Sequence, residues 1–251
     1  MEEKGRAGTR ALGGAAAAAW LIFCLTGIIR LFAGSASIME NTMLRYAPPE
    51  DTGLPGTEYR GVAELIAEYL TGSRDSFQYV FTGEDGQEYL CFHDYEEEHM
   101  ADCRGLISLD TAVCAACGMA AAAFAAAGLK AGRKNGIRDF FAGALAGAGV
   151  FCGAAVLLTV WAAVNFDGFF VTFHLLAFTG DGWLLNPGTD LLIRLMPEEF
   201  FISLGLKGLA AFLPLLALTA AAALRLRRKD GADGKRPGDR DGIRDRGKGK
   251  G

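Results

Sequence analysis

The sequence lacks most of the motifs that mark soluble enzymes. It contains no Gly-x-Ser-x-Gly nucleophile elbow, no Gly-x-Gly-x-x-Gly, no P-loop and no His-Glu-x-x-His, and only three of its 251 residues are histidine. Charge is also missing from four long apolar stretches, although 22% of all residues are charged. This segregation excludes an ordinary soluble enzyme, a disordered chain, a collagen-like chain and a disulfide-rich secreted module.

The four apolar stretches have the length of membrane spans, because a helix needs about 20 apolar residues to cross the hydrocarbon core. Their only charges are Arg30 and Lys207, each near one end of its stretch, where a long side chain can reach the headgroups. We therefore expect an all-α membrane protein with four transmembrane helices and a small extracytoplasmic α+β cap between the first two. The expected parts are a tail (1–10), helix 1 (11–33), the cap (34–110), helix 2 (111–129), helix 3 (140–166), an interfacial loop (167–199), helix 4 (200–224) and a disordered tail (225–251).

The distribution of charge predicts the orientation in the membrane. Residues 1–10 hold three Lys/Arg, residues 130–139 hold four and residues 225–251 hold eleven, whereas residues 35–110 hold sixteen acids, four arginines and no lysine. By the positive-inside rule, both termini lie in the cytoplasm, and the cap and the 167–199 loop face outward. The basic C-terminal tail is expected to contact anionic lipid headgroups. A cleaved signal peptide is the alternative for the first stretch, but its apolar region is too long.

Local patterns predict elements outside the spans. Apolar residues at helical spacing indicate a helix over 59–70 with Thr57 as its N-cap. Residues 76–82 and 88–92 flank a Gly-rich turn and predict a hairpin. A helix is expected to start near Tyr95 and to continue into the second span.

All three histidines fall in the segments predicted to face outward: His93, His99 and His174. On a helix, His99 and Asp102 share a face, and a carboxylate there can orient the ring and raise its basicity. The alternative is that His99 is a solvated residue in an acidic run. His174 stands among phenylalanines, where a histidine is costly unless it has a partner.

Two further alternatives concern metal and disulfide chemistry. His99, Asp102, His174 and Asp190 could bind zinc, although the His-x-x-Asp spacing is unspecific. Cys91 and Cys103 are on the predicted oxidising side and could pair, whereas the other four cysteines lie in the spans. Nothing on the predicted outer face is basic enough to bind nucleic acid.

The outward motifs resemble a bacterial family of four-span membrane proteins that includes the lipoprotein intramolecular transacylases. The resemblance covers about residues 11–224 and begins with Glu96-x-x-His99-Met100-x-Asp102 before the second span. The other matching residues are Tyr69-Leu70, Phe173-His174, Trp183, Pro187, Asp190, Leu192-Ile193, Pro197-Glu198 and Phe200-Phe201. Two positions depart from the family pattern: Cys103 stands where valine is usual, and Ala177 where an aromatic residue is usual.

The resemblance implies an acyltransferase that works without a cofactor or metal. Such an enzyme moves the sn-2 acyl chain of a lipoprotein's diacylglyceryl cysteine to the α-amine of that cysteine, so its partners are membrane lipid and bacterial lipoproteins. The two histidines that the family requires correspond to His99 and His174. We expect Asp102, Glu96 and Asp190 to orient or support them. Arg30 could face the ester or a headgroup, or extend to the membrane surface alone.

Three functions therefore remain open from the sequence. The first is the intramolecular transacylase. The second is a non-enzymatic membrane protein whose acidic cap binds a partner. The third is a metal-dependent membrane hydrolase.

Overall fold

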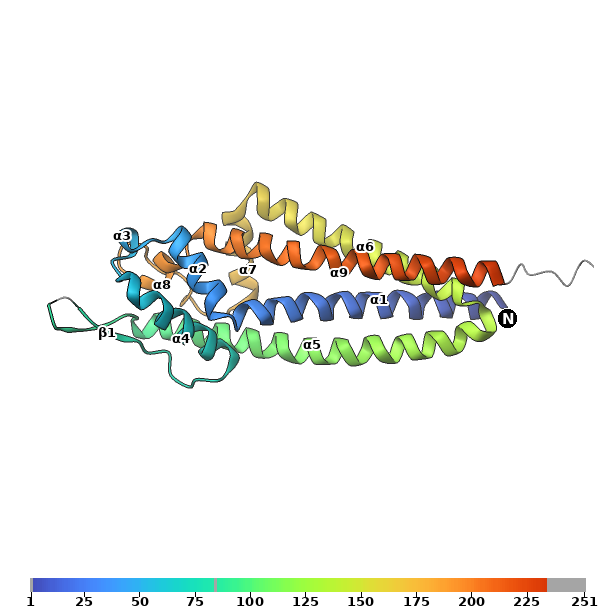
Figure 1. The fold of residues 1–251 in the computed structure, drawn as a ribbon, viewed down its shortest axis with the longest axis horizontal. Helices are drawn as coiled ribbons and strands as arrows, with labels where there is room; N and C mark the ends of the chain where they lie inside the picture. The colour runs from blue at the N-terminus through green and yellow to red at the C-terminus, as the bar shows by residue number, and fades with distance from the viewer. Residues whose placement is uncertain (1, 84, 234–251) are drawn as a thin grey trace, which may run out of the picture.

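The computed structural model describes residues 2–83 and 85–233 of the chain. Four long helices run along the molecule (Figure 1), and all four are long and apolar enough to cross a membrane. They are α1 (Glu2–Ala33), α5 (Asp94–Asn135), α6 (Ile137–Val164) and α9 (Glu198–Asp233). The prediction of a mainly helical protein with four membrane helices is confirmed. Residues 225–233 belong to α9, which corrects the prediction that they are disordered, and residues 234–251 lie outside the described residues.

Helix α1 packs against α5, α6 and α9, and its contact with α6 depends on glycine. A Cβ atom at Gly143 would lie 1.9 Å from the carbonyl oxygen of Arg10, and one at Gly147 would lie 2.7 Å from that of Gly14. The two α6 glycines are four residues apart, which is the small-xxx-small spacing that lets membrane helices approach closely. The backbones of α1 and α6 are therefore in direct contact where the two helices cross.

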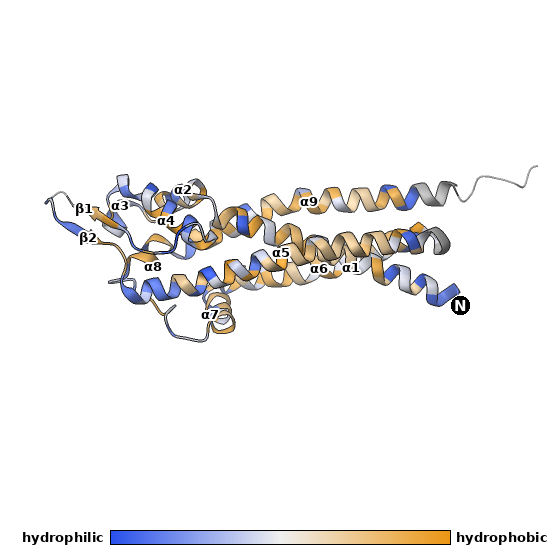
Figure 2. Ribbon diagram, turned by 90° about the horizontal axis from the view of Figure 1, so that it is seen from below, coloured by the Kyte–Doolittle hydropathy of each residue, from blue (hydrophilic) through white to orange (hydrophobic). Residues whose placement is uncertain are grey.

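The polar elements gather at one end of the bundle, away from the N-terminus (Figures 1 and 2). We refer to this end as the cap, which includes α8 in addition to elements of the predicted cap (34–110). It contains α2 (Ala36–Tyr46), α3 (Pro49–Thr52), α4 (Tyr59–Thr71), β1 (Val80–Thr82), β2 (Glu88–Leu90) and α8 (Leu191–Leu195). The strands pair antiparallel, with Phe81 opposite Tyr89. The cap has its own core, in which Leu65, Phe77 and Leu195 are buried together.

The structure confirms the helix predicted over 59–70 and the hairpin, but it corrects their ends. Thr57 is not an N-cap, because a 3₁₀ turn (Gly56–Glu58) leads into α4 and Glu58 takes the cap position without a side-chain bond. The strands are three residues each, shorter than predicted. Helix α2 was not predicted from the sequence, and a 2.6 Å hydrogen bond from Lys207 Nζ to Thr42 Oγ1 joins it to α9.

The segment 167–199 is partly helical, which corrects its prediction as a loop. Asn165 ends α6, and its side-chain oxygen accepts a hydrogen bond from the Gly168 N–H at the start of α7 (Phe166–Ala177). At 12 residues, α7 is about 18 Å long, too short to cross the bilayer. By contrast, α5 has 42 residues and runs without interruption from the cap through its apolar part, as the helix predicted from Tyr95 requires.

Candidate active site

The structure brings His99 and His174 together at the junction between the cap and the long helices. His99 lies in the second turn of α5 and His174 near the end of α7. Their ring centroids are 5.9 Å apart, and their exposed fractions are 9% and 6%. Two buried histidines side by side, from distant parts of the chain, form the centre of the candidate site.

The His174 ring is held by a hydrogen bond at Nδ1 and by aromatic rings packed around it. Its Nδ1 lies 2.7 Å from the carbonyl oxygen of Phe170, one turn earlier in α7. A carbonyl oxygen only accepts, so Nδ1 carries the proton of the neutral ring and Nε2 keeps its lone pair. The rings of Phe170 and Trp183 pack against the imidazole, with centroids 4.0 Å and 4.9 Å away. This environment presents Nε2 as a proton acceptor, and aromatic faces favour a cation.

Burial also sets the charge of His174. It lowers the pKa of His174 below its ordinary value, and the hydrogen bond to the Phe170 carbonyl opposes this effect only in part. Because the ordinary histidine pKa is about 6.5, the ring is neutral at pH 7. It can therefore act as a base at neutral pH.

His99 has a different environment. Its Nε2 lies 3.6 Å from the sulfur of Cys103, one turn later in α5, and the Phe178 ring meets its ring edge-on with a centroid distance of 5.2 Å. Its Nδ1 is buried and has no hydrogen-bond partner among the residues that the structure describes. An unsatisfied buried polar group costs about 1–3 kcal/mol, so Nδ1 is the atom best placed to gain a bond when a polar ligand arrives.

Glu96 and Asp190 both join the start of α5 to the segment around α8. The fully buried Glu96 accepts 2.8 Å hydrogen bonds from the backbone N–H groups of His93 and Leu192, and its carboxylate lies 2.9 Å from Nδ1 of His93. Asp190 is also buried, and it joins the N-terminus of α5 to the segment before α8 through a 2.7 Å bond from the Tyr95 hydroxyl.

Hydrogen bonds determine the charge of Asp190. Burial raises the pKa of Asp190, but hydrogen bonds from Thr189, Tyr95 and the Asn186 N–H outweigh it and lower the pKa below its ordinary value. Asp190 is therefore ionised at neutral pH.

Asp102 and Arg30 do not form hydrogen bonds to the histidine pair among the described residues. Asp102 is exposed, and within residues 2–83 and 85–233 no hydrogen bond joins it to His99, whose ring nitrogen faces Cys103 instead. Arg30 donates a hydrogen bond to the hydroxyl of Thr111. Thr111 is 12 residues beyond His99 on the same helix, or about 18 Å along its axis. The Arg30–Thr111 bond thus lies well away from the histidine pair.

Several contacts were not predicted from the sequence. Phe170 and Phe178 pack on the histidines without having been singled out, although Phe170 is one turn from His174 and so was in reach of spacing arguments. Gly182 lies beside α5, and a Cβ atom there would make an ordinary contact with His99 Cβ at 4.0 Å. Cys91 and Cys103 are both free thiols.

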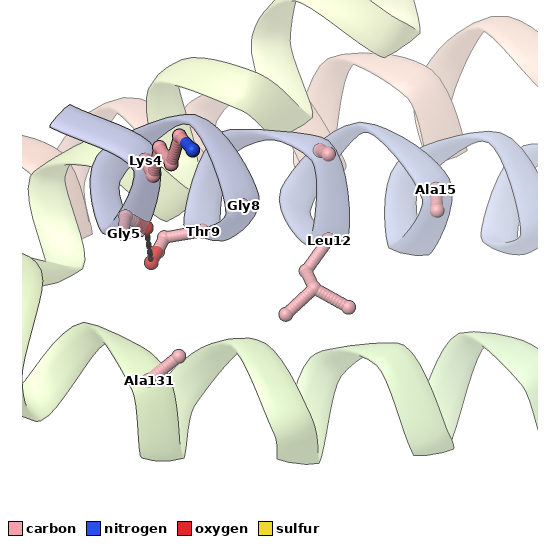
Figure 3. Close-up of a pocket in the computed structure, with 8 residues that line it drawn as sticks. Lys4, Gly5, Gly8, Thr9, Leu12, Ala15 and Ala131 are labelled. Carbon is pink, nitrogen blue, oxygen red and sulfur yellow. Dashed lines mark hydrogen bonds between the residues drawn. The ribbon is translucent and has the colours of Figure 1, made fainter. Parts of the chain in front are cut away.

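Two other observations bear on ligands. In the part of the chain that the structure describes, no group of three or more His, Cys, Asp or Glu side chains is arranged to hold a metal ion. A groove of about 520 Å³ lies between α1 and α5 near the N-terminus, at the end opposite the histidines (Figure 3). It is lined mainly by small and apolar residues, with Lys4 and Thr9 as its polar members.

Fold and site together define a multi-span membrane protein with a buried histidine pair at one end of its helices. The model of the Lit family, lipoprotein intramolecular transacylase Lit, matches residues 15–201. The chain belongs to this family. Membership supports, at the level of the family, a membrane-bound acyltransferase that acts on lipoproteins.

Solved structures agree with the family assignment. The membrane-integral lipoprotein intramolecular transacylase Lit from Bacillus cereus is similar to this chain with a TM-score of 0.67 and 22% identity, over 92% of this chain and 100% of that one. Two variants of that protein, in which a histidine is replaced by arginine or alanine, match with TM-scores of 0.63 and 22% identity. They cover 89% of this chain and 93% and 94% of their own. No curated protein matches.

Proposed function

We propose that this chain is a lipoprotein intramolecular transacylase that uses His99 and His174. It moves the sn-2 acyl chain of a diacylglyceryl cysteine to the α-amine of the same cysteine. The observation that carries the proposal is the pair of buried imidazoles with centroids 5.9 Å apart, in a chain of the Lit family.

The reaction asks for one base and one acid. An α-amine with an ordinary pKa of about 7.7–8.0 must lose a proton as it attacks the ester carbonyl. In our proposal Nε2 of His174 takes this proton. An amide C–N bond forms and the ester C–O bond breaks. The glycerol oxygen that leaves gains a proton from the histidine pair, and His99 donates a hydrogen bond to the ester oxygens. Protons balance and the product is an isomer of the substrate.

The arrangement suits an intramolecular transfer. Acid–base groups of this kind contribute about 10²–10⁴-fold. Donor and acceptor belong to one molecule, so proximity is supplied by the substrate. Neither a serine nor a cysteine nucleophile is needed. Glu96 and Asp190 are positioning residues in this scheme, and the charge of Asp102 favours the protonated form of the pair.

The proposed orientation places the site at the outer leaflet, where the lipid ester lies. Both termini are then cytoplasmic, and the α+β cap is extracytoplasmic. Arg30 lies on the outer side of the apolar part of α1 and faces headgroups. The apolar side chains of α7, among them the exposed Leu175 and Leu176, rest in the lipid surface, and the basic C-terminal tail contacts anionic headgroups of the inner leaflet.

The direct test is mass spectrometry of a lipoprotein's N-terminal peptide. A host that makes only diacylglyceryl lipoproteins is compared with and without this chain. We expect an isomer of unchanged mass that fragments as one O-acyl and one N-acyl group. An unchanged N-terminus, with the protein folded in the membrane, would reject the transacylase and leave partner binding by the cap. Loss of activity on chelation would instead favour a metal-dependent hydrolase.

A further inference from the structure

The contact between His99 and Cys103 is a feature of this chain that the proposed mechanism has not used. Cys103 is four residues after His99, so both side chains lie on one face of α5. The distance from Sγ to Nε2 is 3.6 Å, within the range of a hydrogen bond to sulfur. The resemblance implies valine as the usual residue at this position, so the thiol departs from the family pattern.

The chemistry of the two groups determines the direction of this bond. A thiol sulfur is a weak acceptor, whereas the bare nitrogen of a neutral imidazole is a good one. The bond is therefore better made with the S–H of Cys103 as donor and Nε2 of His99 as acceptor. A neutral imidazole has one proton, which then lies on Nδ1.

The buried environment adds an independent argument. Nδ1 of His99 has no partner among the described residues, and only 9% of the residue is exposed. With the proton on Nδ1, this atom is a donor that lacks only an acceptor. An ester carbonyl or a glycerol oxygen supplies that acceptor.

We propose that Cys103 is a positioning residue that holds His99 in its Nδ1–H tautomer and so makes it the hydrogen-bond donor of the pair. This inference rests on the proposed function for its catalytic meaning. His174 also has its proton on Nδ1, but there the Phe170 carbonyl occupies it and Nε2 stays free as an acceptor. One ring thus presents a donor to the substrate and the other presents an acceptor.

The test is ¹⁵N NMR of the full chain labelled at histidine, in lipid nanodiscs under reducing conditions. Only three histidines are present, and H93Q, H99Q and H174Q assign their signals. We expect the Nδ1–H tautomer of His99 in the original chain and in C103S, which keeps a donor. In C103V, which has a similar shape but no donor, the Nε2–H tautomer is expected to appear. C117V makes the same change elsewhere on α5 and is expected to leave the spectrum unchanged.

Kinetics of the same variants separate positioning from a structural role. We expect kcat to fall about two- to tenfold in C103V, the effect of one weak hydrogen bond, with KM unchanged and with recovery in C103S. The proposal is overturned if His99 is Nε2–H in the original chain, or if C103V has the same tautomer as the original. Absence of transacylation by the original chain with the expected tautomers would instead reject the proposed function and leave the Cys103–His99 bond standing.

Discussion

The buried carboxylate of Glu96 accepts a 2.8 Å hydrogen bond from the backbone N–H of Leu192. The same side chain accepts a bond from the His93 N–H, three residues earlier in the chain. A single residue therefore caps the helix that carries His99 and fastens it to α8, which follows the segment containing Trp183. Substitution of Glu96 is therefore expected to lower the stability of the fold, and to affect catalysis only through the fold.

E96Q is expected to destabilise the protein, because an amide nitrogen replaces one of two oxygens that each face an N–H donor. A hydrogen bond to a charged group contributes about 1.5–3 kcal/mol, and we expect a loss of that size in the free energy of unfolding, measured by thermal unfolding in detergent. E98Q is the matched control, since Glu98 is exposed and surface changes usually stay within about 0.5 kcal/mol. Equal effects in both variants would contradict the fastening role.

H99A and H174A are each expected to lower the transacylation rate about 10²–10⁴-fold. The rate is measured by mass spectrometry of a diacylglyceryl peptide in nanodiscs. H93Q removes the third histidine, whose side chain is half exposed, and is expected to keep activity. Full activity of either alanine variant would reject the two-histidine mechanism, and circular dichroism shows whether a loss of activity occurs in an intact fold.

W183L is expected to weaken catalysis by removing one of the aromatic rings that pack against His174. The ring becomes a cation when it takes the amine proton, and a cation–π contact contributes about 0.5–2 kcal/mol. We expect kcat to fall by about a factor of two to thirty, with a smaller loss in W183F, which keeps a ring. If W183F and W183L lose the same activity, the contribution comes from packing rather than from the π face.

The pKa of His174 predicts how the protein responds to acid. Burial lowers this pKa below its ordinary value, so the folded chain binds the proton only at a pH below about 6.5, whereas the unfolded chain binds it near 6.5. The neutral, reactive form is present above the folded pKa and is lost as the pH falls through it. Acid therefore also reduces the stability of the fold, starting near pH 6.5.

An NMR titration of the labelled histidines measures this directly. The His174 midpoint is expected below that of histidine in an unstructured peptide. A midpoint at or above the peptide value would show that the ring is not buried as described, and it would remove the argument for a neutral base.

The α1–α6 crossing predicts opposite effects for two identical changes. G143A is expected to destabilise the protein, because the new Cβ would lie 1.9 Å from the Arg10 carbonyl oxygen and the helices must separate. G149A meets nothing within 4 Å, and alanine is favoured over glycine in a helix by about 1 kcal/mol. Thermal unfolding of both variants decides the matter, and a stabilising G143A would contradict the close crossing.

The sequence predicted the long helices well, because an apolar run of about 20 residues without charge matches the thickness of the hydrocarbon core. It did not predict α7, because Phe169, Phe170 and Val171 are apolar on every face and carry no periodicity. Helical spacing also could not show whether the His99 ring contacts Asp102 or Cys103, because both residues lie within about one turn of His99 on the same helix. The 5.9 Å approach of the two rings depends on how α7 folds back onto α5, and local sequence carries no signal for that contact.

The two histidines lie on helices of different lengths. His99 belongs to the 42-residue helix α5, which runs through the bundle, whereas His174 belongs to the 12-residue helix α7, which is too short to span the membrane. In the proposed orientation, the position of His99 along the bilayer normal is set by α5, and that of His174 by the depth of α7 in the lipid surface. A change in bilayer thickness is therefore expected to change the distance between the two rings. We expect the turnover of the reconstituted protein to vary with lipid chain length.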